Sequence, residues 1–215
     1  MNELSIRAIV GLLLVAVAVA VAWTGGMAFA FFVAAVSTAI YWEWMQLVRD
    51  RGLGWKVAGF FYCLIPAIAL LWLRDRSELL TGLNGFYLVL WVFIVTWATD
   101  IGGYAVGKTM GRNKLAPAIS PNKTWEGLVG GMVFAAVFGG LWTWRVGLPH
   151  GLFMFAPFAA VAAQVGDLFE SQMKRVAGVK DSGRWLPGHG GVFDRLDGLL
   201  VVATLTAVLI YTETL

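Results

Sequence analysis

Charged residues are scarce in this sequence. Asp, Glu, Lys and Arg make up 13% of its 215 residues, whereas 59% are hydrophobic. A soluble globular domain usually carries about 25% charged residues. Such a low charge content excludes an ordinary soluble domain.

Cysteine is almost absent as well. The single Cys63 lies inside an apolar run, so the chain has no disulfide framework. A small buried residue is the simplest interpretation of this side chain, and it does not identify a cellular compartment.

Long apolar runs fill most of the sequence instead. We count seven, at about 6–24, 27–48, 55–73, 85–107, 126–146, 152–173 and 192–212. Each is long enough to cross a bilayer as a helix of roughly 20 residues. The first run also resembles a secretory signal that ends near AFA at 28–30, but the apolar pattern resumes at once and spans again. We expect an all-α integral membrane protein with about seven transmembrane helices. It forms a single polytopic domain, 1–215, with N-terminal spans in 1–84 and a catalytic part at about 85–215.

Basic residues predict the orientation, because short loops rich in Lys and Arg stay cytoplasmic. With seven spans and a cytoplasmic N-terminus, only Arg74, Arg76 and Arg145 fall outside. The other 13 of the 16 basic residues fall on the cytoplasmic side: Arg7, Arg49, Arg51, Lys56, Lys108, Arg112, Lys114, Lys123, Lys174, Arg175, Lys180, Arg184 and Arg195. An even number of spans or the inverted orientation removes this asymmetry. Topology thus explains the uneven distribution of the basic residues behind the net charge of +3, and we expect no nucleic-acid partner.

The whole chain has 16 basic and 13 acidic side chains, and ten of these charged side chains lie in one stretch, 167–197. Asp167, Glu170, Ser171 and Lys174 are spaced i, i+3, i+4 and i+7, so they share one helix face. Asp194 and Asp197 share a face of the last span, and Asp100 is similarly placed in the fourth. Carboxylates near membrane depth are costly and mark a functional site unless they are paired. Ordinary pairs, Glu170 with Lys174 and Asp194 with Lys180 or Arg184, are the alternative for part of the set.

Glycines lie between these acids, in LPGHGG at 186–191. Gly188, Gly190 and Gly191 allow positive φ and close backbone approach, which suit an anion-binding nest. A larger side chain at Gly190 should therefore harm activity far more than one at Gly139 in the fifth run. Mg²⁺ binds carboxylates together with substrate phosphates. The combination predicts a phosphoryl- or nucleotidyl-transfer site. In it His189 is a general base or a metal ligand, or else a residue that hydrogen-bonds phosphate or caps the loop.

A second long loop, at about 108–125, is expected on the same side. Ser120 with Pro121 resembles a helix N-cap and first turn, and Thr124 is a second candidate cap. A helix start there would bind phosphate, aided by Lys114 and Lys123. A basic loop at the cytoplasmic face is also what topology alone predicts.

The segment Ser171–Asp197, SQMKRVAGVKDSGRWLPGHGGVFDRLD, closely resembles the signature of the phosphatidate cytidylyltransferases, also called CDP-diacylglycerol synthases. That pattern is a Ser, a Lys-Arg pair, a Lys-Asp pair, then PGHGG and DRxD. SPNKTWEG at 120–127 and DIGGYAVGKTMGR, which begins at Asp100, are similar to the family too. The resemblance spans roughly 97–200. The chain is shorter than many members, and we expect it to have one or two fewer N-terminal spans.

The resemblance implies transfer of CMP from CTP to phosphatidic acid in the membrane. It also implies Mg²⁺, with a second cation such as K⁺ as an option, a homodimer, and a multi-pass protein of the plasma (inner) membrane whose active site faces the cytoplasm. The implied catalytic residues are Asp194, Lys174, Arg175, Lys180, Asp181 and His189. Those implied to bind substrate are Ser120, Lys123, Glu126, Ser171, Gly190, Gly191 and Arg195. The implied metal ligands are Asp167, Asp194 and Asp197.

Two other functions use similar parts. A CTP-dependent lipid kinase would transfer the γ-phosphoryl group to a polyprenol and release CDP. An ion-coupled transporter would also place acids within its helices, but near the midplane and often in repeated halves. Here the acids lie toward the cytoplasmic ends of the runs.

Overall fold

Seven helices follow the seven apolar runs closely. The structure is a computed structural model that describes residues 3–76, 84–186, 188 and 190–213, except for the side chains of 3–8 and 213. Along the chain come α1 (Glu3–Thr24), α2 (Gly26–Leu47), α3 (Leu53–Asp75), α4 (Gly85–Met110), β1 (Lys114–Ala116), β2 (Ser120–Thr124), α5 (Trp125–Val146), α6 (His150–Val176) and α7 (Phe193–Glu213).

Length and apolar character make this a helical membrane protein. Five helices, α2 to α6, are long and apolar enough to cross a bilayer, and Ile9–Thr24 of α1 forms a shorter apolar helix. Local signals mark the limits of two of them. The side chain of Asn84 caps the start of α4, and Gly147 ends α5 in the left-handed conformation, with φ of 70°, which glycine adopts readily.

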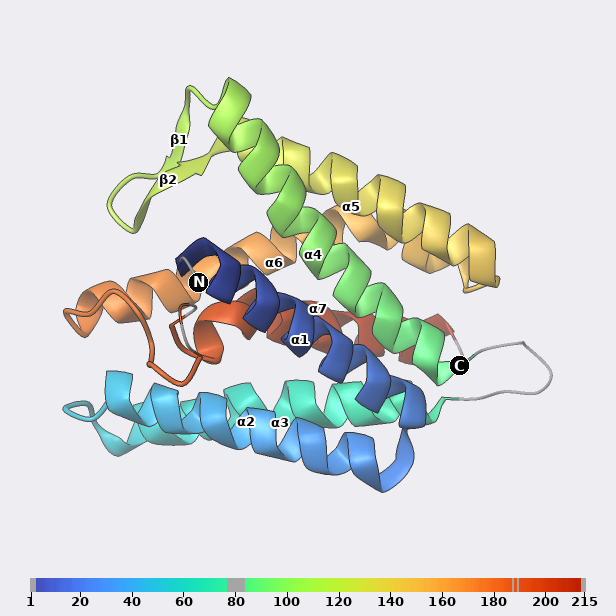
Figure 1. Cartoon of the computed structure of the whole chain (residues 1–215), viewed down its shortest axis with the longest axis horizontal. Helices are drawn as coiled ribbons and strands as arrows, with labels where there is room; N and C mark the ends of the chain where they lie inside the picture. The colour runs from blue at the N-terminus through green and yellow to red at the C-terminus, as the bar shows by residue number, and fades with distance from the viewer. Residues whose placement is uncertain (1–2, 77–83, 187, 189, 214–215) are drawn as a thin grey trace.

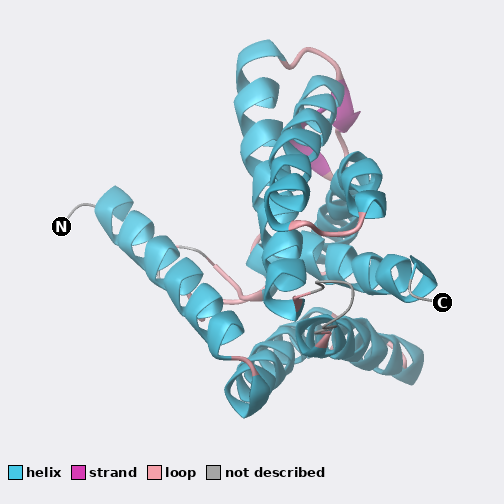
Figure 2. Ribbon diagram, turned by 90° about the vertical axis from the view of Figure 1, so that its right-hand side faces the viewer, coloured by secondary structure: helices cyan, strands magenta, loops and turns pink. Residues whose placement is uncertain are grey.

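α4 lies at the centre of the bundle and contacts α3, α5, α6 and α7. Its buried side chains include Leu88, Val89, Trp91, Val92 and Val95. α2 and α3 run side by side along one flank (Figure 1). Figure 2 shows that α1 joins α2 at one end and leans away from the other helices toward its N-terminus.

The connecting segments divide between the two ends of the helices (Figure 1). The α2–α3 link, the segment between α4 and α5 and the segment between α6 and α7 lie toward one end, as does the start of α1. The α1–α2 and α5–α6 links lie toward the opposite end. The two longest described connections, 111–124 and 177–192, thus share an end.

The segment before α5 forms a β-hairpin, which corrects two expectations. β1 and β2 pair antiparallel, with Lys114 opposite Thr124 and Ala116 opposite Ser120, so the protein is not purely α-helical. Ser120 and Pro121 lie in a strand and do not begin a helix. Pro121 is tolerated there because both strands of a two-stranded sheet are edges. Thr124, the second candidate, does cap α5, and its Oγ1 accepts from the Gly127 N–H at 3.0 Å.

Candidate active site

The site forms where α6 packs closely against α7. A Cβ at Gly166 would lie 2.8 Å from the carbonyl oxygen of Asp197, so only glycine allows this approach. The next residue, Asp167, is thereby brought beside Asp197. Carboxylate oxygens of Asp167, Glu170 and Asp197 lie within 4.8 Å of one another. We call these three residues the acid cluster.

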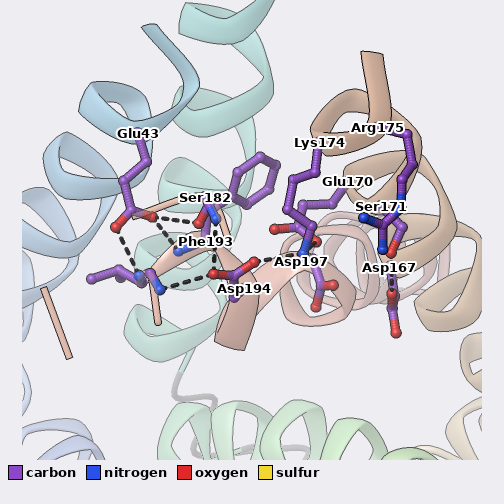
Figure 3. Close-up of polar contacts among 12 residues, drawn as sticks. Glu43, Asp167, Glu170, Ser171, Lys174, Arg175, Ser182, Phe193, Asp194 and Asp197 are labelled. Atoms are coloured by element: carbon purple, nitrogen blue, oxygen red, sulfur yellow. Dashed lines mark hydrogen bonds and ion pairs between the residues drawn. The ribbon is translucent and has the colours of Figure 1, made fainter. Parts of the chain in front are cut away.

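Lys174 joins the acid cluster to Asp194. Its Nζ lies 2.6 Å from Glu170 Oε2 and 2.6 Å from Asp194 Oδ1, and Figure 3 shows it reaching between the two helices. The expected i,i+4 pair of Glu170 with Lys174 is therefore confirmed. Among the described residues, the ion-pair partner of Asp194 is Lys174 rather than Lys180 or Arg184.

Lys123 of the hairpin approaches the acid cluster from another direction. Its Nζ lies 2.6 Å from Asp167 Oδ2 and donates to Gln164 Oε1 at 2.8 Å. Ser171 Oγ donates to the second oxygen of Asp167 at 3.2 Å. Lys123 of β2 and Lys174 of α6 itself therefore balance acids on one face of α6.

The segment 177–192, which we call the glycine loop, turns back at Leu186, whose N–H donates to the Gly190 carbonyl. Gly188 and Gly190 have φ of 74° and 85°, which confirms the expected positive φ at these two positions. The loop is tied to α7 by Asp194 Oδ2, which accepts from the Ser182 N–H at 3.0 Å and the Gly191 N–H at 2.8 Å.

The acid cluster has the donor set of a divalent-cation site. Its ligand atoms are hard carboxylate oxygens, which Mg²⁺ prefers. Glu170 is 1% exposed, and within the described part of the chain its Oε1 is buried with no hydrogen-bond partner. A buried unpaired carboxylate oxygen is costly, and a cation bound by the acid cluster would satisfy it. These residues therefore fit a metal ion.

A cavity of about 660 Å³ reaches this polar centre. Its apolar walls come from α1 to α4 and from α7, with Leu14, Phe32, Val36, Trp97 and Leu199 among the lining residues. Its polar lining consists chiefly of Asp100, Asp167, Glu170, Lys174, Asp194, Arg195 and Asp197. The same cavity therefore has an apolar part, lined by hydrocarbon side chains, and a polar end, lined by acids and cations.

The structure brings together part of the predicted metal set. Asp167 and Asp197 lie in the acid cluster, but Asp194 does not, and Glu170 takes the third place. The reason is that both oxygens of Asp194 are engaged, Oδ1 by Lys174 and Oδ2 by two backbone N–H groups. Asp194 therefore holds Lys174 and the glycine loop beside the acid cluster.

The other predicted residues are distributed around this centre. Arg175 donates from Nε to the Ile119 carbonyl at 3.2 Å and so contacts the hairpin turn. Glu126, in the first turn of α5, accepts from Asn113 Nδ2 at 2.8 Å and lines a separate depression. Lys180 and Asp181 are exposed on the glycine loop. Ser120 lies in β2, and His189 lies outside the described residues.

Two contributors were missed by the sequence reasoning. Gln164, one turn before the acid cluster, accepts from Lys123. Glu43 of α2 is buried and accepts from the Ser182 hydroxyl at 2.9 Å. A signal for Glu43 existed, since it is an acid within a long apolar run, the same signal that singled out Asp100.

Comparison with known proteins agrees with this chemistry. The model of a family described as "Cytidylyltransferase family" matches residues 55–212. A phosphatidate cytidylyltransferase of Brucella suis biovar 1 (strain 1330) is 34% identical over 254 positions, covering 95% of this chain and 92% of the relative. A phosphatidate cytidylyltransferase of Haemophilus influenzae is 39% identical over 189 positions, covering 84% of this chain and 62% of the relative. The Bacillus subtilis (strain 168) phosphatidate cytidylyltransferase is 46% identical over 121 positions, covering 55% of this chain and 45% of the relative.

Proposed function

The chain belongs to the cytidylyltransferase family, and we propose that it transfers CMP from CTP to phosphatidic acid, giving CDP-diacylglycerol and pyrophosphate. The relatives named phosphatidate cytidylyltransferase support this reaction. The observation that carries it in the structure is the cavity, whose apolar walls end at the acids and lysines of the site.

The cavity suits one lipid substrate and one polar substrate. Acyl chains would lie along the apolar walls from α1, α2 and α4, and burial of their methylene groups would favour binding. The phosphate of phosphatidic acid would then reach Lys174 and Arg195, which line the polar part. CTP would approach from the hairpin side, where Lys123 lies. The predicted roles of Ser120 and Glu126 on the nucleotide side remain proposals.

We propose that Asp167, Glu170 and Asp197 hold Mg²⁺. The ion would supply charge neutralisation for the phosphates at the site. Asp194, predicted as a ligand, would instead orient Lys174 and the glycine loop. A second cation such as K⁺ stays a prediction.

The proposed reaction is an in-line displacement at the α-phosphorus of CTP. An oxygen of the phosphatidate phosphate forms a bond to that phosphorus, the bond to the oxygen bridging toward the β-phosphate breaks, and pyrophosphate leaves with the electron pair. The attacking phosphate has a second pKa near 6, by analogy with phosphorylated side chains, so it is largely dianionic at neutral pH and requires no general base. Its approach to CTP requires relief of repulsion, which Lys174, Arg175, Lys180 and Lys123 would supply through electrostatic stabilisation.

The test is transfer of label from CTP into lipid. Purified protein in detergent, with phosphatidic acid and Mg²⁺, should move α-phosphate label into the lipid phase and release an equal amount of pyrophosphate. Label at the γ-phosphate should stay in water, and excess EDTA should stop the reaction. Lipid that carries only γ-label would identify a kinase. A folded protein that binds no CTP and moves neither label would return the transporter hypothesis.

The finer topology is also part of the proposal. We propose seven spans, a cytoplasmic N-terminus and a cytoplasmic site in the plasma (inner) membrane, on the basis of the distribution of Lys and Arg. In a Cys63→Ala background, Val179→Cys should react with a membrane-impermeant thiol reagent only from the cytoplasmic side. His150→Cys should react only from the other side. Reaction of both from one side would exclude this topology.

A homodimer, expected from the family resemblance, is checked by the mass of the detergent-solubilised protein.

A further inference from the structure

Glu43 is a buried acid that lies before the region matched by the family model, which begins at residue 55. Its residue exposure is 1%, and it belongs to α2, far along the chain from α7. Its Oε1 accepts from the Val192 N–H at 3.0 Å. Its Oε2 accepts from the Ser182 hydroxyl at 2.9 Å and from the Phe193 N–H at 2.8 Å.

Two of these three donors are backbone N–H groups at the start of α7. The first N–H groups of a helix have no partner within it, and the positive end of the helix dipole favours an anion there. A side chain from the preceding turn usually fills that place. Here a carboxylate from a separate helix does so, and the three donors explain how Glu43 can be buried.

The glycine loop is consequently held between two carboxylates. Ser182 donates through its hydroxyl to Glu43 and through its backbone N–H to Asp194. Figure 3 shows these bonds running from Glu43 through the loop to Asp194, on the side of Asp194 away from Lys174. Asp194 in turn pairs with Lys174, which pairs with Glu170. A continuous set of contacts therefore joins α2 to the acid cluster.

The backbone around Glu43 leaves no spare room. A Cβ at Gly191 would lie 2.6 Å from Glu43 Oε2, and a Cβ at Gly183 would overlap Oε1. The carboxylate is thus enclosed by the loop backbone on two sides, so its position and the path of the loop determine each other.

We propose that Glu43 is a positioning residue for the transfer reaction. By fixing the first turn of α7 and the glycine loop, it sets the direction of Asp194 and Asp197 toward the acids of α6. It acts through these residues, since Glu43 is not among the described residues that line the cavity. This inference rests on the proposed function for its activity readout.

The variant that tests it is Glu43→Gln. The amide keeps the size of the side chain but has one acceptor oxygen, so it cannot accept from Val192 and Phe193 together as the carboxylate does. We expect kcat to fall by about 10- to 100-fold, because small displacements of reacting groups cost up to about 100-fold. The KM values for CTP and phosphatidic acid should stay within about 2-fold, because the groups that line the cavity are retained. The matched control is Thr38→Val on the same helix. Among the described residues, its hydroxyl donates only to the Ala34 carbonyl of its own helix, so kcat should not change.

Hydrogen exchange gives a readout independent of activity. The amide protons of Val192 and Phe193 should exchange faster in Glu43→Gln than in the unmodified protein, while those in the middle of α4 should not. A merely stabilising role would lower the folded fraction and leave kcat per folded molecule unchanged. Wild-type kcat per folded molecule in Glu43→Gln would therefore overturn the proposal, as would unchanged exchange.

Ser182→Ala provides a milder variant in case Glu43→Gln does not fold. It removes one of the three donors and keeps the Ser182 N–H, so kcat should fall by about 2- to 5-fold, the range expected when one modest hydrogen bond is lost. In that case an unchanged kcat would overturn the proposal. If the unmodified protein transfers no CMP at all, the proposed function fails, and hydrogen exchange still decides whether Glu43 holds the loop.

Discussion

The hairpin and the glycine loop lie at the same end of the helices, yet they are held in different ways. The hairpin pairs with itself, β1 with β2, and its other contacts run from Asn113 to Glu126 in the adjoining first turn of α5 and from Lys123 and Ile119 to α6. In the described part of the glycine loop, one isolated bridge joins Leu186 to Gly190. Its other main anchors are side-chain carboxylates from α2 and α7.

This difference shows which segment depends on the rest of the molecule. A hairpin paired with itself keeps its path when a neighbouring helix shifts. A loop whose N–H groups donate to carboxylates on two helices keeps its path only while those helices stay in place. The glycine loop should therefore be sensitive to substitutions distant in sequence, and the hairpin mainly to substitutions near it.

The largest effect should come from Asp194→Asn, which breaks the anchor of the glycine loop. The amide is nearly the same size, so the protein should fold, but it loses the charge that pairs with Lys174 and one of the acceptor oxygens. Removal of one partner from a buried ion pair costs about 3–5 kcal/mol, and we expect at least about a 100-fold loss of CMP transfer. The measurement is the initial rate with α-labelled CTP, at equal folded protein. A loss below about 5-fold would show that the loop does not depend on this carboxylate.

A smaller effect should follow from Lys123→Met, which cuts the contact between the hairpin and α6. The methionine keeps the length of the side chain and removes the charge that faces Asp167. A charge-assisted contact contributes about 1.5–3 kcal/mol, so the rate should fall by about 10- to 100-fold while the hairpin persists. Lys114→Met on the neighbouring strand is the matched control. The helix start that Lys114 was expected to assist is a strand, and Lys114 is exposed in β1, so the rate should change by less than about 2-fold. Equal losses in the two variants would mean that the general charge of the hairpin matters, and not its contact with Asp167.

The smallest effect on activity should come from Thr124→Val. This change removes the hydroxyl that caps α5 and keeps the shape of the side chain. Loss of such a cap costs about 1 kcal/mol, so the thermal unfolding midpoint in detergent should fall by a few degrees. CMP transfer at a permissive temperature should stay within about 2-fold. A large loss of activity with an unchanged midpoint would show that the hairpin affects the site more directly than its own pairing suggests.

The helices could be predicted from the sequence because their length and apolar character are local properties. The predicted boundaries lie within a few residues of the observed ones. The hairpin was missed because Ser120 followed by Pro121 also fits the start of a helix, and strand pairing over so few residues leaves little pattern. A larger side chain at Gly190 was predicted to harm activity far more than one at Gly139, and this stays a prediction. Gly139 does not face lipid as expected, however, because a Cβ there would lie 2.7 Å from Val95 Cγ2 and 3.3 Å from Ala156 Cβ.

The candidate site was predictable in its residue types and only partly in its geometry. Helical spacing placed Asp167 and Glu170 on one face, and both lie in the acid cluster. Spacing could not show that Lys174 engages Asp194 from across the helix interface. Nor could it show that Glu43 contacts Phe193, because the two residues are 150 positions apart. Such contacts depend on how the helices pack, and the local pattern does not record this.

The cavity between α1 and the bundle also affects how the rate of this protein should depend on its substrate. An insoluble lipid that enters from the surrounding hydrocarbon is encountered in two dimensions, at a surface density. Under the proposed function, the rate should follow the mole fraction of phosphatidic acid in a vesicle or micelle, and extra inert lipid should slow the enzyme by dilution even when the bulk concentration is constant. CTP, which arrives from water, should show ordinary saturation with its bulk concentration.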